Sequence, residues 1–162
     1  MNGFYPVVAV VLITLVAAPP AEQGAAVPAD FALHIIGGLC SGPTIDTRDE
    51  TYRREIVTGR WVTAKVSLTP VQRSALFEMV TVAELMAYPE EFVPTARSRV
   101  IPASRHVITV QFGSQRRTIR WTDHASEEPA AMRLRQFIRQ VRAYFEAMPE
   151  VARLPKQQAF CL

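Results

Sequence analysis

Alternating apolar and polar residues predict β-strands in the first part of this chain. The runs 31–36, 44–47, 51–57 and 61–68 have this character, and Gly, Pro and Asp residues typical of turns lie between them. In the run 61–68 every second side chain is apolar, which places those side chains on one face of an extended strand. The first part of the chain therefore predicts short strands joined by tight turns.

The clearest pattern is a β-hairpin formed by residues 106–112 and 115–122 around Gly113 and Ser114. Glycine at the first position of a two-residue loop favours a type II′ turn, and such a loop fixes the register of the strands. The predicted opposite pairs are His106–Trp121, Val107–Arg120, Ile108–Ile119, Thr109–Thr118, Val110–Arg117 and Gln111–Arg116. The side chains expected on the buried face are Ile108, Val110, Phe112, Ile119 and Trp121.

Between the fourth run and the hairpin, the hydrophobic period changes to that of a helix. The pattern predicts a helix from about residue 70 to 86, with Thr69 as its N-cap and Pro70 in the first helical position. Residues 89–104 contain three prolines and predict a loop, which we expect to contact the core through Phe92. The apolar stripe of the helix consists of Val71, Ala75, Leu76, Met79, Val80 and Ala83.

A second amphipathic helix is predicted after the hairpin, beginning near Ser126, which we expect to cap it, and ending at Pro149. Its apolar stripe consists of Leu134, Phe137, Ile138, Val141, Tyr144, Phe145 and Met148. The opposite side carries Arg135, Arg139 and Arg142, which form either a solvated surface or a candidate anion-binding face.

The order strands, helix, hairpin, helix predicts the α+β class. We expect a four- to five-stranded antiparallel sheet with two helices packed on one face, preceded by an apolar leader helix. Residues 30–155 are sufficient for one domain, and residues 156–162 are then a C-terminal tail.

The N-terminal segment 1–29 predicts a signal peptide or an N-terminal anchor. Residues 4–18 carry no charge. This segment has the length of the apolar region of a secretory signal and is shorter than the roughly 20 residues that span a bilayer. Small residues precede Asp30, as at a cleavage site, but no Lys or Arg lies in residues 1–3. The segment therefore predicts a periplasmic or secreted protein, with an uncleaved membrane tether or a buried apolar helix as alternatives.

Two cysteines, Cys40 and Cys161, are the only ones in the chain. In an oxidising compartment an even number favours a disulfide, which here ties the tail to the domain. The disulfide would close a loop of about 120 residues, and the chain-entropy model gives about 4–5 kcal/mol of stabilisation for a loop of this length. Two free thiols are the alternative.

Composition narrows the classes of function. The 18 Lys and Arg against 15 Asp and Glu give a net charge of only +3. These basic residues are spread along the chain without the dense patch of a nucleic-acid-binding module, so no nucleic-acid partner is expected. The three histidines show no metal-ligand spacing.

No catalytic, cofactor-binding or metal-binding residue is assigned from the sequence. Residues 38–42 match a nucleophile elbow in outline, but Pro43 follows and no helix is predicted there, so we interpret them as a glycine-rich turn. Among His34, His106 and His124, only His124 lies near acidic residues, an arrangement that is also typical of a helix cap.

Several short motifs together resemble a group of small exported bacterial α+β domains of unknown function. They are Gly37 to Gly42, Leu68-Thr69-Pro70, Tyr88-Pro89-Glu90-Glu91-Phe92, Arg120-Trp121 and Leu134 to Phe145. The order of the predicted elements has a fainter similarity to emfourin-type protein inhibitors of metallopeptidases. This similarity implies that the chain inhibits a protease, but it identifies no inhibitory residue.

The sequence therefore predicts a non-enzymatic binding module with a protein partner in the cell envelope, inhibitor-like or accessory in role. A small envelope hydrolase that uses His124 or His106 with a carboxylate is one alternative. A structural envelope protein tethered to the membrane by residues 4–18 is the other.

Overall fold

The computed structural model describes residues 26–37, 42–95 and 103–158. The predicted leader helix and the predicted Cys40–Cys161 disulfide lie outside these ranges. At the described end of the tail, the Gln158 N–H donates to the Ile56 carbonyl at 2.7 Å. No helix among the described residues has the length and apolar character required to cross a bilayer.

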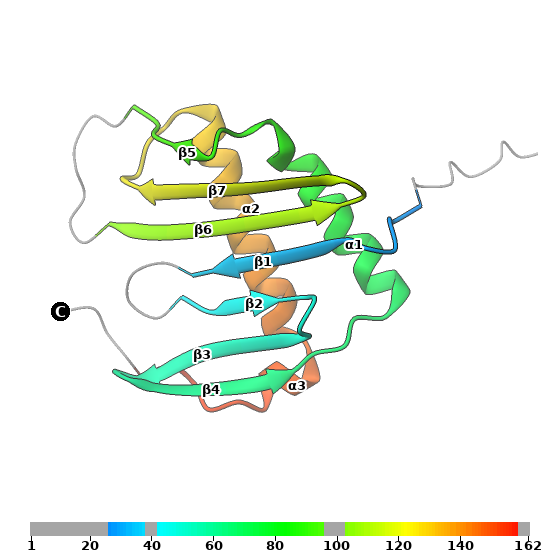
Figure 1. Ribbon diagram of the computed structural model, residues 1–162. Coiled ribbons are helices and arrows are strands. Elements are labelled where there is room, and N and C mark those ends of the chain that lie inside the picture. Colours follow the sequence, from blue (N-terminus) through cyan, green and yellow to red (C-terminus); the bar gives the residue numbers. More distant parts are fainter. Residues whose placement is uncertain (1–25, 38–41, 96–102, 159–162) are drawn as a thin grey trace, which may run out of the picture.

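The chain has the α+β class, and its strands form one seven-stranded mixed sheet (Figure 1). The strand order is β4-β3-β2-β1-β6-β7-β5, and only β5 runs parallel to its neighbour, β7. The strands are β1 (Ala32–Ile36), β2 (Thr44–Asp46), β3 (Thr51–Val57), β4 (Arg60–Lys65), β5 (Glu91–Phe92), β6 (Ser104–Phe112) and β7 (Gln115–Asp123).

The predicted four- to five-stranded antiparallel sheet is therefore wrong in the number of strands, and it is wrong in strand direction for the β5–β7 pair, which is parallel. β1 pairs with β2 on one side and with β6 on the other, so the early strands and the hairpin merge into one sheet. β5 is only two residues long and lies within the predicted loop 89–104. No alternation can be read from two residues, so the parallel pair had no local signal.

The hairpin prediction is confirmed in detail. Every predicted pair of β6 and β7 is a register pair of the structure, from His106–Trp121 to Gln111–Arg116. Gly113 has φ of +57°, as the first position of a type II′ turn requires. Ile108, Val110, Ile119 and Trp121 are buried together.

The first helix is confirmed at its start and is shorter than predicted at its end. In α1 (Pro70–Val82), the Thr69 hydroxyl accepts from the Gln72 N–H, and the Gln72 side chain accepts from the Thr69 N–H. This capping box fixes the N-terminus. Glu84, with φ of +53°, interrupts the helix before a single 3-10 turn, η1 (Leu85–Ala87). Val71, predicted in the apolar stripe, is 78% exposed.

The second helix, α2 (Pro129–Glu146), begins later than predicted, with Glu128 as its N-cap. The prediction that Ser126 caps it is wrong, because the helix begins two residues further on, after Glu128. The buried Ser126 hydroxyl donates to the Thr95 carbonyl at 2.6 Å and accepts from the Glu128 N–H at 3.2 Å, so it holds the turn that precedes the helix. A third helix, α3 (Pro149–Ala152), starts at the proline that ends α2.

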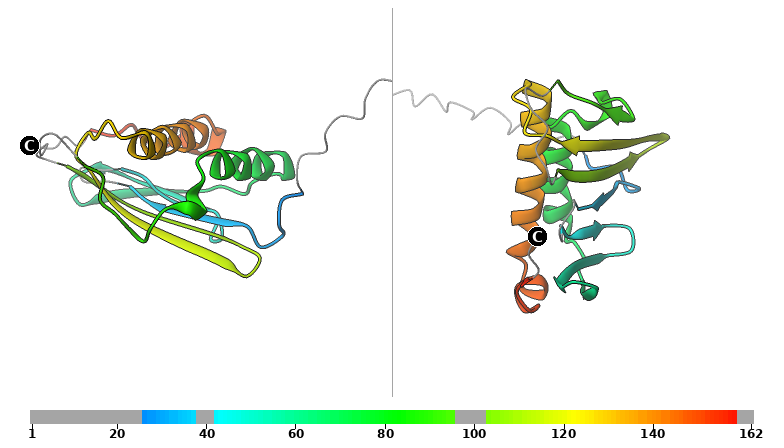
Figure 2. Two further views of the ribbon diagram at one scale, coloured as in Figure 1. Left: turned by 90° about the horizontal axis from the view of Figure 1, so that it is seen from above. Right: turned by 90° about the vertical axis from the view of Figure 1, so that its left-hand side faces the viewer.

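Both longer helices lie on one face of the sheet, as Figure 2 shows from two sides. The core between them and the sheet joins Ile108, Ile119 and Trp121 to Phe137 and Val141 of α2. The predicted shared interior of hairpin and helices is therefore present. The opposite face of the sheet is left without a helix over it in the described ranges.

Candidate functional site

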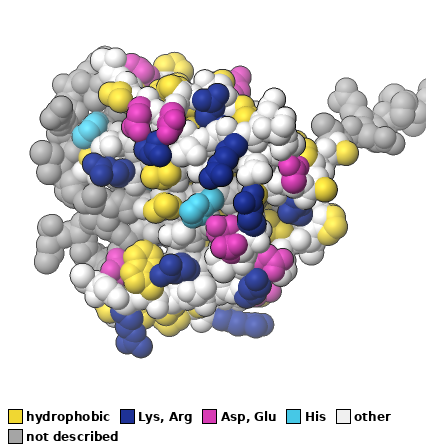
Figure 3. Space-filling view, in the orientation of Figure 1, with side chains coloured by type: hydrophobic (Ala, Val, Ile, Leu, Met, Phe, Trp, Pro, Cys, Tyr) yellow, Lys and Arg dark blue, Asp and Glu magenta, His cyan; other side chains and the backbone are white. Residues whose placement is uncertain are grey.

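The uncovered side of the sheet, here called the open face, is the main candidate for function. Figure 3 looks onto it and shows Lys and Arg side chains interspersed with acidic ones, with apolar side chains as separate spots. The register places one side chain from each strand in a continuous row. In strand order this row is Thr63, Arg53, Thr44, Ile36, Val107, Arg120 and Glu91.

An apolar pair occupies the centre of this row. Ile36 of β1 lies opposite Val107 of β6, and 44% of Ile36 is exposed although β1 is the central strand of the sheet. Towards the β4 edge, Trp61 is 42% exposed, and the Arg53 guanidinium lies 5.4 Å from the centre of its ring. Tryptophan and arginine around an apolar centre are the residue types enriched at protein interfaces.

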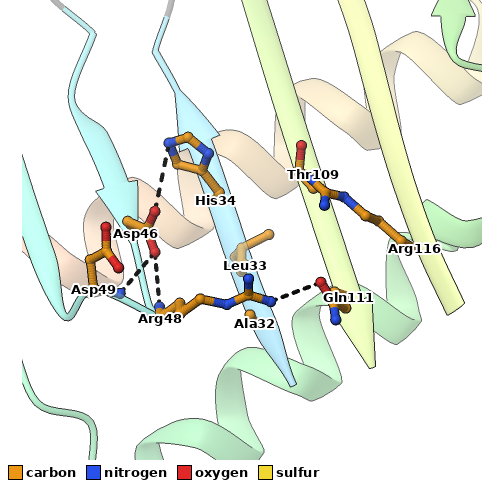
Figure 4. A pocket seen from close by; sticks show the side chains of 9 residues that line it. All are labelled: Ala32, Leu33, His34, Asp46, Arg48, Asp49, Thr109, Gln111 and Arg116. Carbon is orange, nitrogen blue, oxygen red and sulfur yellow. Dashed lines mark hydrogen bonds and ion pairs between the residues drawn. The ribbon is translucent and has the colours of Figure 1, made fainter. Parts of the chain in front are cut away.

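On one side of the central pair, the open face has a polar hollow of about 300 Å³, shown in Figure 4. Strand β1 forms its floor, the turn after β2 forms one wall, and β6 and β7 form the other. The lining residues are Ala32, Leu33, His34, Asp46, Arg48, Asp49, Thr109, Gln111 and Arg116. We call this the Arg48–Arg116 hollow.

Asp46 organises the turn that forms the first wall. Its Oδ1 accepts from the backbone N–H groups of Arg48 and Asp49 at 2.9 and 3.0 Å. Its Oδ2 lies 3.9 Å from Nε2 of His34 on the neighbouring strand. Arg48 then extends across β1 and donates from Nη2 to Oε1 of Gln111 at 2.8 Å.

The hollow offers hydrogen-bond donors and positive charge rather than a nucleophile. No serine or cysteine is among its lining residues. The Thr109 hydroxyl is hydrogen-bonded to that of Thr118 at 3.1 Å. Such a constellation is suited to holding a polar or anionic group of a ligand.

A second hollow of about 370 Å³ lies on the other side of the central pair, towards β5. Arg105, Val107 and Arg120 contribute to it from the open face, and His124 lines it from beyond the end of β7. Arg120 is ion-paired with Glu90 and Glu91, which fastens the β5 segment to β7.

The three arginines predicted as an anion-binding face each have a different neighbour. Arg139 donates to the Gln136 side chain at 2.7 Å, and Arg142 donates to Glu146 at 2.8 Å. Arg135 instead forms two 2.7 Å hydrogen bonds with Asp123 at the end of β7. Nothing in the structure tests whether this face binds an anion, so it stays a prediction.

Asp123 is a structural anchor of α2. Partial burial alone would raise the pKa of Asp123, but hydrogen bonds from Arg135 and the Ala125 N–H, together with the Arg135 charge, outweigh burial and lower that pKa. The charged form of the pair is therefore stabilised in the fold.

The three histidines lie in different environments. His106 packs on the helix-covered side, its ring centre 5.4 Å from that of Trp121, and burial lowers its pKa although the nearby Asp123 charge opposes this. His124 lines the second hollow and His34 the Arg48–Arg116 hollow. Within the described ranges, no three His, Cys, Asp or Glu side chains gather as metal ligands.

Sequence reasoning did not identify Arg48 or Gln111 as site residues. The hairpin register already predicted that Gln111 lies opposite Arg116 on the outer side. Arg48 reaches Gln111 because β1 pairs with both β2 and β6, which places the turn after β2 one strand away from β6. The chain matches no protein-family model and no curated protein sequence.

Proposed function

We propose that this protein is an exported, non-enzymatic binding module that holds a partner protein against the open face of its sheet. The observation that carries the proposal is the apolar Ile36–Val107 pair, which joins two strands in the middle of the strand order and leaves 44% of Ile36 exposed on that face. In the described ranges the helices lie on one side of the seven-stranded sheet, and the other side presents a broad surface of fixed geometry, because backbone pairing holds each strand in place.

The surroundings of the pair support a protein as the partner. Arginines and Trp61 surround the apolar centre, and a hollow lies on each side of it. Interface cores of this kind are apolar and aromatic, with a polar and charged rim. Side chains of a partner could enter both hollows while its surface covers Ile36.

The proposal is tested by capture of proteins from the native envelope fraction with matched variants. Ile36→Glu places a charge in the centre of the open face, and Val82→Glu places the same charge on α1, where Val82 is 69% exposed. Both positions are exposed, so both variants should fold, which circular dichroism checks. We expect stoichiometric capture by the wild type and by Val82→Glu, and at least tenfold weaker capture by Ile36→Glu.

Equal capture by both variants, or none by the wild type, would contradict the proposal. A hydrolase that used His124 would lose turnover in His124→Gln, whereas the binding module should retain its partner. The cellular location is tested by mass spectrometry of the mature N-terminus. A chain beginning at Asp30 supports export and release, whereas an intact Met1 supports a tethered protein.

A further inference from the structure

The Arg48–Arg116 hollow has two guanidinium groups that reach towards it from opposite sides. Figure 4 shows Arg48 extending from the turn beside β2 and Arg116 extending from β7 towards Thr109. Their elements are joined only through the sheet, by the pairing of β2 with β1, β1 with β6 and β6 with β7. The sheet register therefore fixes the separation of the two backbone positions from which these side chains extend.

The space between these groups exists because the residue beneath it is small. Ala32 of β1 lies opposite Gln111, on the same face as His34, and forms the floor at this point. A longer side chain at this position would fill the volume over which Arg48 extends. The hollow is open to solvent, so a group carried on a larger molecule can enter it.

Neither guanidinium group of the hollow is paired with a carboxylate in the described part of the chain. The Arg116 guanidinium has no hydrogen-bond or ion-pair partner there, and the Arg48 guanidinium donates to the neutral side chain of Gln111. The Asp46 carboxylate is bound to its own turn and lies beside His34. In Figure 4, Asp49 lies on the β2 side of Asp46, away from both guanidinium groups.

We propose that the Arg48–Arg116 hollow binds a single carboxylate group, presented by an acidic side chain of the protein partner. Guanidinium groups bind carboxylates through paired hydrogen bonds, and the Gln111 amide and the Thr109 hydroxyl offer additional polar contacts. Two arginines and two aspartates line the hollow, so one added negative charge is tolerated better than the two of a phosphate dianion. The inference rests on the proposed function only in that a protein partner supplies the carboxylate. The site itself is argued from the hollow alone.

The test uses the isolated protein and small probes followed by two-dimensional NMR. The probes are blocked glutamate with one side-chain carboxylate, blocked glutamine as its neutral equivalent, and inorganic phosphate. We expect saturable shifts of the amide signals of residues 109–111 with blocked glutamate, none with blocked glutamine, and weaker shifts with phosphate. Arg48→Gln and Arg116→Gln should each weaken glutamate binding about three- to tenfold, as for exposed charge-assisted contacts.

Arg153→Gln is the matched control, because Arg153 is an exposed arginine at the end of α3, which lies on the helix side of the sheet. It should leave the affinity unchanged. Weakening by Arg153→Gln equal to that by Arg116→Gln, stronger binding of phosphate than of blocked glutamate, or no saturable shift would each overturn the inference. If the probe binds but no envelope protein is captured, the carboxylate site stands and the proposed function is rejected. If an envelope protein is captured but no probe binds, the proposed function stands and the carboxylate site is rejected.

Discussion

The two faces of the sheet are built from the same strands and differ by one residue in register. Leu33, Ile108 and Ile119 point to the helices and are fully buried, whereas the adjacent His34, Thr109 and Thr118 lie on the open face. Apolar burial contributes about 25 cal/mol for each Å² removed from water, so the covered face supplies most of the stability. The open face is free to vary, and its polar and charged side chains are available for recognition.

The largest difference between the faces should appear when an aromatic side chain is removed from each. Phe137→Ala deletes a fully enclosed side chain of α2 and should lower the free energy of unfolding by about 3–5 kcal/mol. Trp61→Ala removes a half-exposed ring that contacts Arg53 and should lower it by about 1 kcal/mol or less. Urea denaturation of both variants measures this contrast, and similar losses would remove the distinction between the faces.

A smaller contrast is expected between ion pairs. Asp123→Asn removes the charge and leaves a single acceptor oxygen, so at most one of the two hydrogen bonds from Arg135 is kept. The change should cost about 1–2 kcal/mol at neutral pH, because solvent partly screens the pair. Glu50→Gln breaks the exposed Lys65–Glu50 pair, whose nitrogen and oxygen are 3.2 Å apart, and should leave stability nearly unchanged. Chemical denaturation at pH 7 compares the two.

The Asp123 pair also predicts the sign of a pH effect. Since the folded pKa of Asp123 is below its ordinary value of 3.8, the stabilisation is present above pH 3.8 and is lost as pH falls through the folded pKa. The stability difference between wild type and Asp123→Asn should therefore decrease in acid. A difference that grows below pH 4 would contradict this assignment.

His106 provides a further pH-dependent contrast, on the covered face. The pKa of His106 in the folded protein is below the ordinary 6.5. As pH falls, the unfolded chain therefore binds a proton at this histidine before the folded chain does, and protonation favours unfolding. Stability from this group is present above pH 6.5 and is lost as pH falls through the folded pKa. His106→Phe should remain folded, since Nδ1 has no hydrogen-bond partner within the described ranges. Its stability relative to wild type should rise between pH 8 and 5, and a constant difference in urea midpoints would refute this.

The smallest effects on stability are expected from the proposed site. Arg48→Gln and Arg116→Gln change exposed side chains of the open face and should alter the free energy of unfolding by no more than about 0.5 kcal/mol. The measurement is the same urea series. A loss above 2 kcal/mol from either change would show that these arginines support the fold rather than a ligand.

Local features of the fold were predictable because adjacent residues determine them. The Thr69–Pro70 start of α1 and the Gly113–Ser114 turn depend on chemistry within four residues, and both are confirmed. The Ser126 cap was not correct: the helix begins two residues later, after Glu128, and the Ser126 hydroxyl instead links the Glu128 N–H to the Thr95 carbonyl, 31 residues earlier in the chain. The sequence similarly placed Arg135 on the polar side of the helix, as part of a solvated surface or an anion-binding face, and only the fold brings Asp123 within hydrogen-bond distance of it.

The sequence by itself determined the class of the fold, the hairpin register and which side of each main element is apolar, since periodicity and turn chemistry act over a few residues. Only the tertiary structure decided that β1 pairs with β6, that β5 adds a parallel strand, and that Arg48 and Arg116 reach one hollow. Backbone N–H and C=O groups are the same in every strand, so strand neighbours are selected by the packing of the whole core. The candidate site depends on that selection, because its residues come from four separate segments.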